Sequence, residues 1–310
     1  MYESTVYGSA RGDAAGSEPT ALARGGVLLT AWALAAGWPP GRLAARLRRD
    51  GWQRICRGAW AAPGKETDWR VRETALQLLS PRRVCGHAAA ARLHRIGLLA
   101  PGPPRPSWSA SRASLPPEDV CLRRGLRTTT AARTAADLIR AAGSREEAVT
   151  VADSALSRRV VEGVRREPPV RYEELAAQLA VRRPGAPRAR TWLRLADPAA
   201  GSPAETVARL RMADAALVPE CQPPLRTPRG QVLRPDFLFR GPGLAVEIEG
   251  YAYHGSRAAH ERDIARYNAL QSCPEVRRIL RFTAREVFTR PDRVTAAVRT
   301  ALAELAAEPA

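Results

Sequence analysis

Lysine is the residue type that this sequence most clearly lacks. Lys65 is the only one, so arginine makes up nearly all of the 49 basic residues. Together with abundant alanine, proline and glycine, this bias suggests GC-rich coding, which weakens arginine content as a functional signal. The formal net charge is nevertheless +18. Because arginine clusters release counterions when they meet phosphates, this charge favours a polyanionic partner.

Paired cysteines and long apolar segments are also absent. The five cysteines include no C-x-x-C pair and have no histidines at zinc spacing, which argues against a zinc finger and for reduced, structural thiols: Cys56, Cys85, Cys121, Cys221 and Cys273. No run of about 18 apolar residues occurs. The amino terminus shows no apolar segment flanked by basic residues. We therefore expect a soluble, cytoplasmic protein without a membrane segment.

A chain of 310 residues with 45% apolar residues is long enough for two or three domains with their own cores. Composition and turn signals predict five segments: a disordered tail (1–20), a first domain (21–65), a middle domain (66–165), a helical connector (166–200) and a last domain (201–310). The tail is polar and rich in glycine and serine, which predicts disorder.

The first domain is expected to contain two short helices, separated by Gly-Trp-Pro-Pro, and a β-hairpin in WQRICRGAWAAP. A helix, a turn, a basic helix and a basic hairpin form the outline of a winged helix-turn-helix. Its candidate DNA-binding residues lie on the second helix and the hairpin: Arg42, Arg46, Arg48, Arg49, Arg54 and Arg57. The alternative is a small helical hairpin plus two strands with a solvated arginine face.

Three stretches together resemble the amino-terminal region of AbiEi-type antitoxins of abortive-infection systems, over about residues 21–160. They are RICRGAWAAP, VCGHAAAARLHRIGLL and GLRTTTAARTAADLIR. The resemblance implies a winged helix followed by a mixed α/β domain. It also implies that the winged helix binds promoter DNA for autoregulation, and it allows a cognate toxin as a partner.

The last domain opens with a helix capped by Ser202, with Glu205 in the capping-box position. Three strands are expected in VLRPDFLFR, LAVEIEG and RRILRFT, with a long polar helix over about 256–271 and a final helix after Pro291. Side chains alternate along a strand, so Glu247 and Glu249 share one face. Asp236, in the neighbouring strand of the predicted hairpin, is close enough to share a metal with Glu247, and oxygen ligands suit Mg²⁺.

The pattern R-P-D, followed by E-x-E with its first glutamate eleven positions after the aspartate, resembles the PD-(D/E)XK nuclease core. The continuation Y-x-Y-H-G, the E-R-D-x-x-R-Y-N helix and the I-L-R-F-T strand narrow the resemblance, over about 201–305, to very-short-patch-repair endonucleases. It implies that Asp236 and Glu247 bind the metal and that Glu205 is the acid of the first helix. Glu249 stands where the superfamily usually has lysine, and a carboxylate supplies no positive charge to a transition state.

Further residues could supply what that lysine would provide: His254 or Arg262 for proton transfer or charge, with Asp263 orienting either. Each candidate also has a purely structural interpretation. Glu205 could only cap its helix, Asp236 could begin a turn, His254 could hydrogen-bond a loop, and Arg262 with Asp263 could be surface ions.

The sequence thus predicts an α/β protein (α+β overall) with a winged helix-turn-helix, a mixed α/β middle domain and a restriction-endonuclease-like domain whose central mixed sheet is flanked by helices. The first functional hypothesis is a protein that binds double-stranded DNA and hydrolyses phosphodiesters with Mg²⁺ or Mn²⁺, without an organic cofactor. The second is a non-enzymatic, antitoxin-like repressor of a toxin–antitoxin or phage-defence system. A third is an interaction protein in which both elements are relics.

Overall fold

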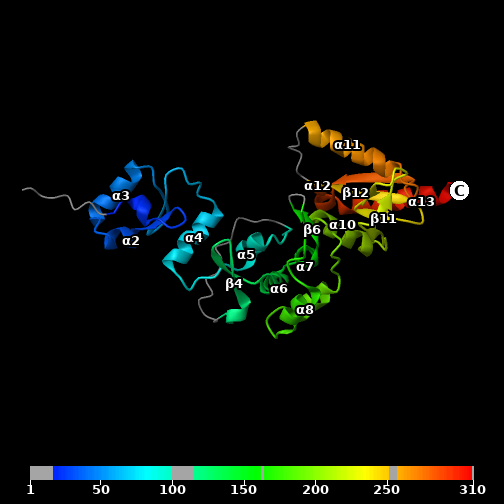
Figure 1. Cartoon of the computed structure of the whole chain (residues 1–310). Helices are drawn as coiled ribbons and strands as arrows, with labels where there is room; N and C mark the ends of the chain where they lie inside the picture. The colour runs from blue at the N-terminus through cyan, green and yellow to red at the C-terminus, as the bar shows by residue number, and fades with distance from the viewer. Residues whose placement is uncertain (1–16, 100–114, 162–163, 251–256, 309–310) are drawn as a thin grey trace, which may run out of the picture. The chain divides into compact units, whose positions relative to one another are not determined.

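The structure is a computed structural model that describes residues 17–99, 115–161, 164–250 and 257–308 (Figure 1). It is a mixed α/β protein with several small sheets. Its described parts fall into two compact units, the first formed by residues up to 85 together with 108–128, and the second by 86–107 together with 129–310. No helix in these ranges combines the length and the apolar character needed to cross a bilayer.

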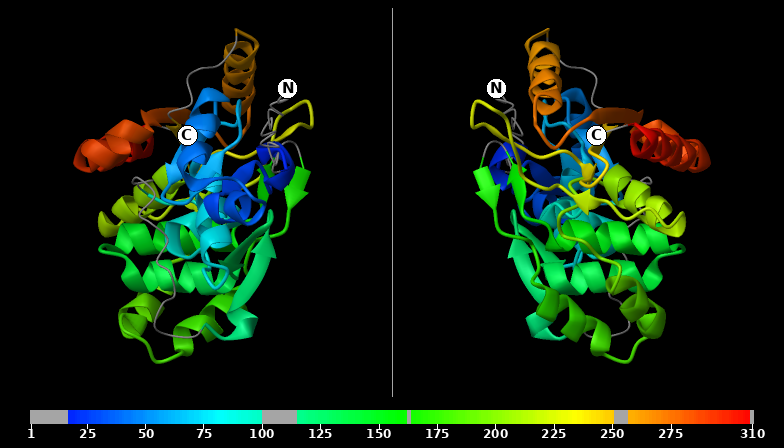
Figure 2. Two further views of the ribbon diagram at one scale, coloured as in Figure 1. Left: turned by 90° about the vertical axis from the view of Figure 1, so that its left-hand side faces the viewer. Right: turned by 90° about the vertical axis from the view of Figure 1, so that its right-hand side faces the viewer.

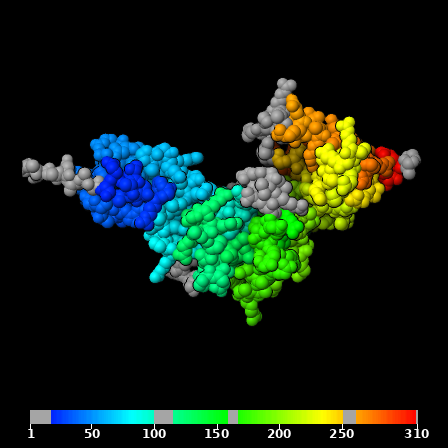
Figure 3. Space-filling model, in the orientation of Figure 1, coloured from blue at the N-terminus to red at the C-terminus, as the bar shows by residue number. Residues whose placement is uncertain are grey.

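The first unit is built on a three-stranded antiparallel sheet in the order β1-β3-β2. Its elements are α1 (Pro19–Leu22), β1 (Val27–Leu29), α2 (Thr30–Ala35), α3 (Pro40–Arg49), β2 (Gln53–Cys56), β3 (Ala59–Ala61) and α4 (Trp69–Leu79). The two helices and the hairpin predicted here are present. In the space-filling view the beginning of this unit forms a continuous surface coloured blue to cyan (Figure 3).

Both faces of this small sheet are covered. Leu28 lies opposite Trp60 in the register of β1 and β3, and both pack with Leu43 and Leu47 of α3. The alternate residues of the same strands, among them Val27, pack with α4 on the other face. Because successive strand residues point to opposite faces, a three-residue apolar strand serves two cores.

A hairpin of β4 (Val120–Arg123) and β5 (Leu126–Thr129), preceded by a 3-10 turn (Pro117–Asp119), completes the first unit. Its two turn residues, Arg124 (φ +50°) and Gly125 (φ +79°), have positive φ, as tight hairpin turns require. Gln77 of α4 holds the hairpin at two points. Its Nε2 donates to the Arg127 carbonyl over 2.7 Å, and its Oε1 accepts from the Arg127 N–H over 3.0 Å.

The second unit begins with a helical layer around one apolar core. It contains α5 (His87–His94), α6 (Ala131–Ala141), α7 (Arg145–Leu156), α8 (Tyr172–Ala180) and α9 (Ala186–Leu193), with a small hairpin of β6 (Arg159–Val161) and β7 (Val164–Arg166). The green helices of this layer are seen in Figure 2. Leu175, Leu179 and Leu193, from the stretch predicted as a connector, belong to the same core as Ile139.

The rest of the second unit surrounds a four-stranded sheet in the order β13-β12-β11-β8. Its elements are α10 (Pro203–Asp214), β8 (Glu220–Cys221), β11 (Phe237–Phe239), β12 (Leu244–Glu249), α11 (Arg257–Gln271), β13 (Arg278–Thr283), α12 (Ala284–Thr289) and α13 (Pro291–Ala307), with β9 (Leu225–Arg226) and β10 (Val232–Leu233) in a separate pair. β11 and β12 are antiparallel, whereas β12 and β13 are parallel.

The expectation of one strand over VLRPDFLFR was wrong, because the run divides into β10 and β11, which lie in different sheets. Pro235 lies between them, and proline cannot donate a ladder hydrogen bond. Asp236 consequently occupies a bend directly before β11 and is not inside a strand. The strands expected over LAVEIEG and RRILRFT, and the final helix from Pro291, are confirmed.

The central sheet also has two covered faces. Val246 and Ile248 pack with Phe237, α10, α12 and α13 on one face. Ala245, which directly precedes Val246, packs with Leu270 of α11 on the other face. Glu247 and Glu249 have the same parity as Ala245, so β12 directs its two glutamates to the α11 face.

A candidate carboxylate site

Asp236 is held in place by three hydrogen bonds. Its Oδ2 accepts from the Ile248 N–H of β12 over 2.7 Å, and its Oδ1 accepts from Gln222 Nε2 over 3.0 Å. The backbone N–H of Gln222 also donates to the Asp236 carbonyl over 3.0 Å. The Asp236 carboxylate therefore has a fixed orientation beside β12, the strand that carries Glu247 and Glu249.

Glu205 lies next to Asp236 because Gln222 connects them. The same Gln222 Nε2 donates to Glu205 Oε2 over 3.1 Å, and that oxygen also accepts from the Gly201 N–H over 2.7 Å. Ser202 caps α10 as predicted, with its Oγ accepting from the Glu205 N–H. Glu205 is only 7% exposed. It thus supports the helix start and is also one of the acids near Asp236.

The pKa of Asp236 shows how closely the acids are grouped. Burial, as the largest cause, and then the negative charges of Glu205 and Glu247 raise this pKa from 3.8 to about 8. The hydrogen bond from Ile248 and the charge of Arg266 act in the opposite direction. A buried carboxyl among like charges favours its neutral form unless a cation compensates it. A cation bound beside Asp236 would therefore favour the ionised form of this carboxyl.

Arg266 of α11 compensates Glu247. Its Nη1 donates to Glu247 Oε2 over 2.7 Å and its Nη2 to Oε1 over 3.3 Å, a two-pronged ion pair. Nη2 also donates to the Arg234 carbonyl over 2.8 Å. Sequence reasoning missed both Arg266 and Gln222. The only available signal for Arg266 was its place, with Tyr267 and Asn268, in the E-R-D-x-x-R-Y-N motif.

Glu249 has a different cationic partner, Arg281 of β13, which forms a salt bridge with it. Arg281 lies opposite Glu247 in the parallel register, and its guanidinium lies 5.1 Å from the centre of the Tyr267 ring. Glu249, which the sequence resemblance aligned with a lysine, is thus paired with an arginine. Positive charge reaches this face of β12 from two neighbouring elements.

The remaining residues predicted for this site do not lie beside Glu205, Asp236 and Glu247 in the part of the chain that the structure describes. Arg262 and Asp263 are exposed on α11, although the charge of Asp263 acts on Arg266. His254 lies outside the described residues. The structure therefore brings together Glu205, Asp236 and Glu247.

A divalent ion fits this set by chemistry, because carboxylate oxygens are the ligands that Mg²⁺ and Mn²⁺ prefer. Asp236 and Glu247 would hold it, with Glu205 nearest to them. As the side chains stand, however, Arg266 and Gln222 take up carboxylate oxygens. Across the described ranges no three His, Cys, Asp or Glu side chains are arranged to hold a metal ion. Metal binding would require Arg266 to move away from Glu247.

The predicted DNA-binding arginines belong to the first unit. Arg42, Arg54 and Arg57 are exposed and have no ion pair with another residue that the structure describes. Arg46 is half-buried and forms an ion pair with Asp50, whose other oxygen lies 3.7 Å from Arg49 Nε. Arg48 is exposed, and its guanidinium lies 5.8 Å from the Trp60 ring centre. The six residues are therefore three open cations, two that share one aspartate, and one beside an aromatic ring.

Comparisons with known proteins give no family for the chain. No protein-family model matches it, and searches of curated proteins and of solved structures found no match.

Proposed function

We propose that the protein binds double-stranded DNA and hydrolyses its phosphodiester bonds at Glu205, Asp236 and Glu247 with Mg²⁺ or Mn²⁺. The observation that carries this proposal is the pKa of Asp236, which burial, Glu205 and Glu247 raise to about 8. Strongly shifted carboxyls that are fixed by hydrogen bonds occur preferentially at functional sites. Neutral side chains of similar shape at these three positions would avoid the electrostatic repulsion and desolvation of grouped carboxylates, so the presence of acids here supports a functional role.

The order of elements around the site supports the same proposal. A helix (α10), antiparallel strands (β11 and β12), a helix (α11) and a parallel strand (β13) follow one another, and the acids lie on α10, before β11 and on β12. This is the layout that the resemblance to very-short-patch-repair endonucleases implies. The amino-terminal unit has the order α1, β1, α2, α3, β2 and β3, which agrees with a winged helix-turn-helix.

The residues of the site have separate tasks in this proposal. Asp236 and Glu247 provide ligand oxygens, and Gln222 fixes Asp236 relative to Glu205. The guanidinium of Arg266, once released from Glu247, is near enough to stabilise negative charge on a phosphate. When bound, a divalent ion supplies an activated water and charge stabilisation at phosphorus. Glu249, held by Arg281, orients that arginine.

A plasmid assay tests the proposal. Supercoiled plasmid is incubated with the pure protein and Mg²⁺ or Mn²⁺, and nicked and linear products are measured. We expect cleavage by the wild type and loss of cleavage in Asp236→Ala with Glu247→Ala. Asp292→Ala, an exposed acid in the first turn of α13, is the matched control and should cleave normally. Equal cleavage by the wild type and the double variant would refute the proposal.

A second function, a non-enzymatic antitoxin-like repressor, is favoured by one observation. Glu247 and Glu249 are both already paired with arginines, so this face of the sheet is compensated without a metal. In this proposal the carboxylate domain is a binding platform for a cognate toxin protein. We expect specific binding to DNA upstream of the protein's own gene, lost in Arg42→Ala with Arg54→Ala. Equal binding to unrelated duplexes would contradict it.

A further inference from the structure

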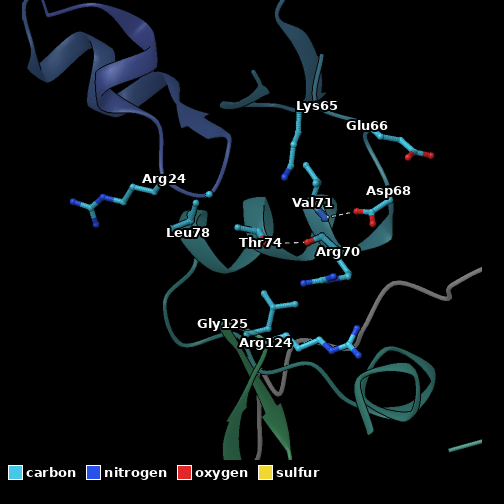
Figure 4. Close-up of a pocket in the computed structure, with 12 residues that line it drawn as sticks. Arg24, Lys65, Glu66, Asp68, Arg70, Val71, Thr74, Leu78, Arg124 and Gly125 are labelled. Carbon is cyan, nitrogen blue, oxygen red and sulfur yellow. Dashed lines mark hydrogen bonds between the residues drawn. The ribbon is translucent and has the colours of Figure 1, made fainter. Parts of the chain in front are cut away.

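A hollow in the first unit is lined by cations that the predicted DNA-binding surface does not include. Its volume is about 600 Å³, and it lies beside α4, between the start of β1 and the turn of the β4–β5 hairpin (Figure 4). Lys65 points into it from above, and Arg70 and Arg124 lie at its lower edge. Arg24 also belongs to its lining, and its guanidinium lies 4.7 Å from the Trp32 ring centre.

The backbone fixes where these cations start. The stem of Lys65 lies across Gly26, so closely that a Cβ added to this glycine would come within 3.3 Å of it. Arg70 is in the first turn of α4, and its carbonyl accepts from Thr74 Oγ1. Arg124 occupies the turn of the hairpin that Gln77 binds to α4 at two points. Three separate segments thus present positive charge to one hollow.

The acids of the lining offset this charge only in part. Asp68 caps α4, with its Oδ1 accepting from the Val71 N–H over 2.8 Å, and Glu66 is exposed. The four basic residues therefore outnumber two acids, one of which is engaged by the helix. The apolar part of the lining consists of Val71, Leu78 and Leu126, with no aromatic ring among the described lining residues. Such a site can bind phosphate oxygens but gives a nucleobase no ring for stacking.

We propose that this hollow binds the phosphate backbone of duplex DNA, as a second contact apart from the arginines of α3 and the β2–β3 hairpin. The inference rests on the proposed DNA-binding function and extends it. An open site with several cations and no stacking surface fits a sugar-phosphate backbone, whose contacts position a protein without reading sequence. Lys65, Arg70 and Arg124 contact consecutive or facing phosphates, so binding through the hollow is independent of sequence and sensitive to salt.

The test uses the full chain and a fluorescent duplex of arbitrary sequence, with EDTA present so that no cleavage occurs. Binding is measured over a range of salt concentrations for the wild type and for Arg70→Gln with Arg124→Asn. Asparagine tolerates the positive φ of position 124 better than arginine, so this variant does not add backbone strain. The matched control is Arg72→Gln with Arg123→Gln, which removes two exposed charges from the same helix and hairpin but outside the hollow.

We expect the hollow variant to bind on the order of tenfold more weakly and to lower the slope of log K against log salt by about 2, because each lost phosphate contact contributes about 0.9. The control should keep nearly the wild-type slope. If the wild type binds DNA and the hollow variant matches the control, this inference is wrong while the proposed function stands. If the wild type binds no duplex even at low salt, the proposed function fails and the inference fails with it.

A calorimetric titration distinguishes a DNA phosphate from a free phosphate anion as the ligand of the hollow. Tripolyphosphate is titrated against the wild type and the hollow variant by calorimetry. We expect weak binding compared with duplex DNA. Tight tripolyphosphate binding that needs Arg70 and Arg124, together with unchanged DNA affinity of the hollow variant, would overturn the inference in favour of a free phosphate anion. Melting temperatures of all variants identify any loss of folding.

Discussion

The side-chain amide of Gln222 donates to two carboxylates at once, over 3.0 Å to Asp236 Oδ1 and over 3.1 Å to Glu205 Oε2. Gln222 has a φ of +50°, so its backbone adopts the left-handed region to place this amide. One neutral donor therefore bridges two acids from different segments, Glu205 of α10 and Asp236 directly before β11. The arrangement lets the acids stay close without a bound cation.

Replacing Gln222 with alanine should destabilise the protein by about 1–3 kcal/mol, because two partly buried carboxylates lose a donor. The loss should be larger at pH 9 than at pH 5, since protonated Asp236 repels Glu205 less. Urea unfolding at both pH values measures it. Gln231→Ala, at an exposed glutamine, is the control. A loss for Gln222→Ala no greater than for the control would contradict the bridging role.

The raised pKa of Asp236 predicts a pH dependence of stability. The unfolded chain releases this proton near pH 4, whereas the folded protein keeps it to about pH 8. Between these values the folded state binds more protons, so the free energy of unfolding falls as pH rises. The slope from this group is at most about 1.4 kcal/mol per pH unit. Denaturant unfolding of the wild type and of Asp236→Asn from pH 4 to 9 measures the difference.

In Asp236→Asn this part of the slope should vanish, so the difference in stability between the two proteins should change steadily with pH up to about 8 and then level off. A difference that is constant over this range would show that Asp236 ionises normally in the folded state.

Arg266 should lower the pKa of Asp236, because its positive charge favours the ionised carboxyl. Arg266→Gln should consequently move the levelling-off point above pH 8. Arg262→Gln, an exposed arginine one turn earlier on α11, should leave it unchanged. A shift in the second variant and none in the first would assign the compensating charge to Arg262, as sequence reasoning allowed.

Asp153 connects the helical layer to α10 and should be among the least replaceable polar residues. It is 1% exposed and accepts from the Asp197 N–H over 2.7 Å, from Thr206 Oγ1 over 2.8 Å and from Arg209 Nη2 over 2.9 Å. Asp153→Ala leaves Arg209 without this partner and should cost about 3–5 kcal/mol of unfolding free energy. Asp292→Ala is the exposed control. A loss below about 1 kcal/mol would contradict the connection.

Local patterns predicted much of the carboxyl-terminal layout. Alternating apolar residues identified β12, and the cap at Ser202 and Pro291 identified the starts of α10 and α13. The site was less predictable, because its partners depend on contacts between distant segments. Arg266 contacts Glu247 only because α11 connects β12 to the parallel strand β13. Gln222 contacts Asp236 with a positive φ that no local sequence pattern predicts. The identification of both functional domains stays a prediction.

Replacing a glycine can cause two kinds of strain, one from a positive φ and one from steric overlap of the new Cβ with a neighbour. Gly185, immediately before α9, is expected to show both. Its φ is +80°, and a Cβ there would lie 2.5 Å from the Arg140 carbonyl oxygen of α6. Gly230 has almost the same φ, +81°, but a Cβ there would meet nothing within 4 Å. Gly230→Ala should therefore cost only the strain of left-handed alanine, about 1–2 kcal/mol. Gly185→Ala should cost about 1–3 kcal/mol more, because α9 must move away from α6.

Urea unfolding of the two single variants gives this comparison directly, and the difference between them measures the close approach of α9 to α6. Because α6 and α9 share the core of the helical layer, the extra loss should appear as earlier unfolding of the second unit. Equal losses at the two glycines would mean that the start of α9 does not lie against Arg140, and the packing of this layer would need revision.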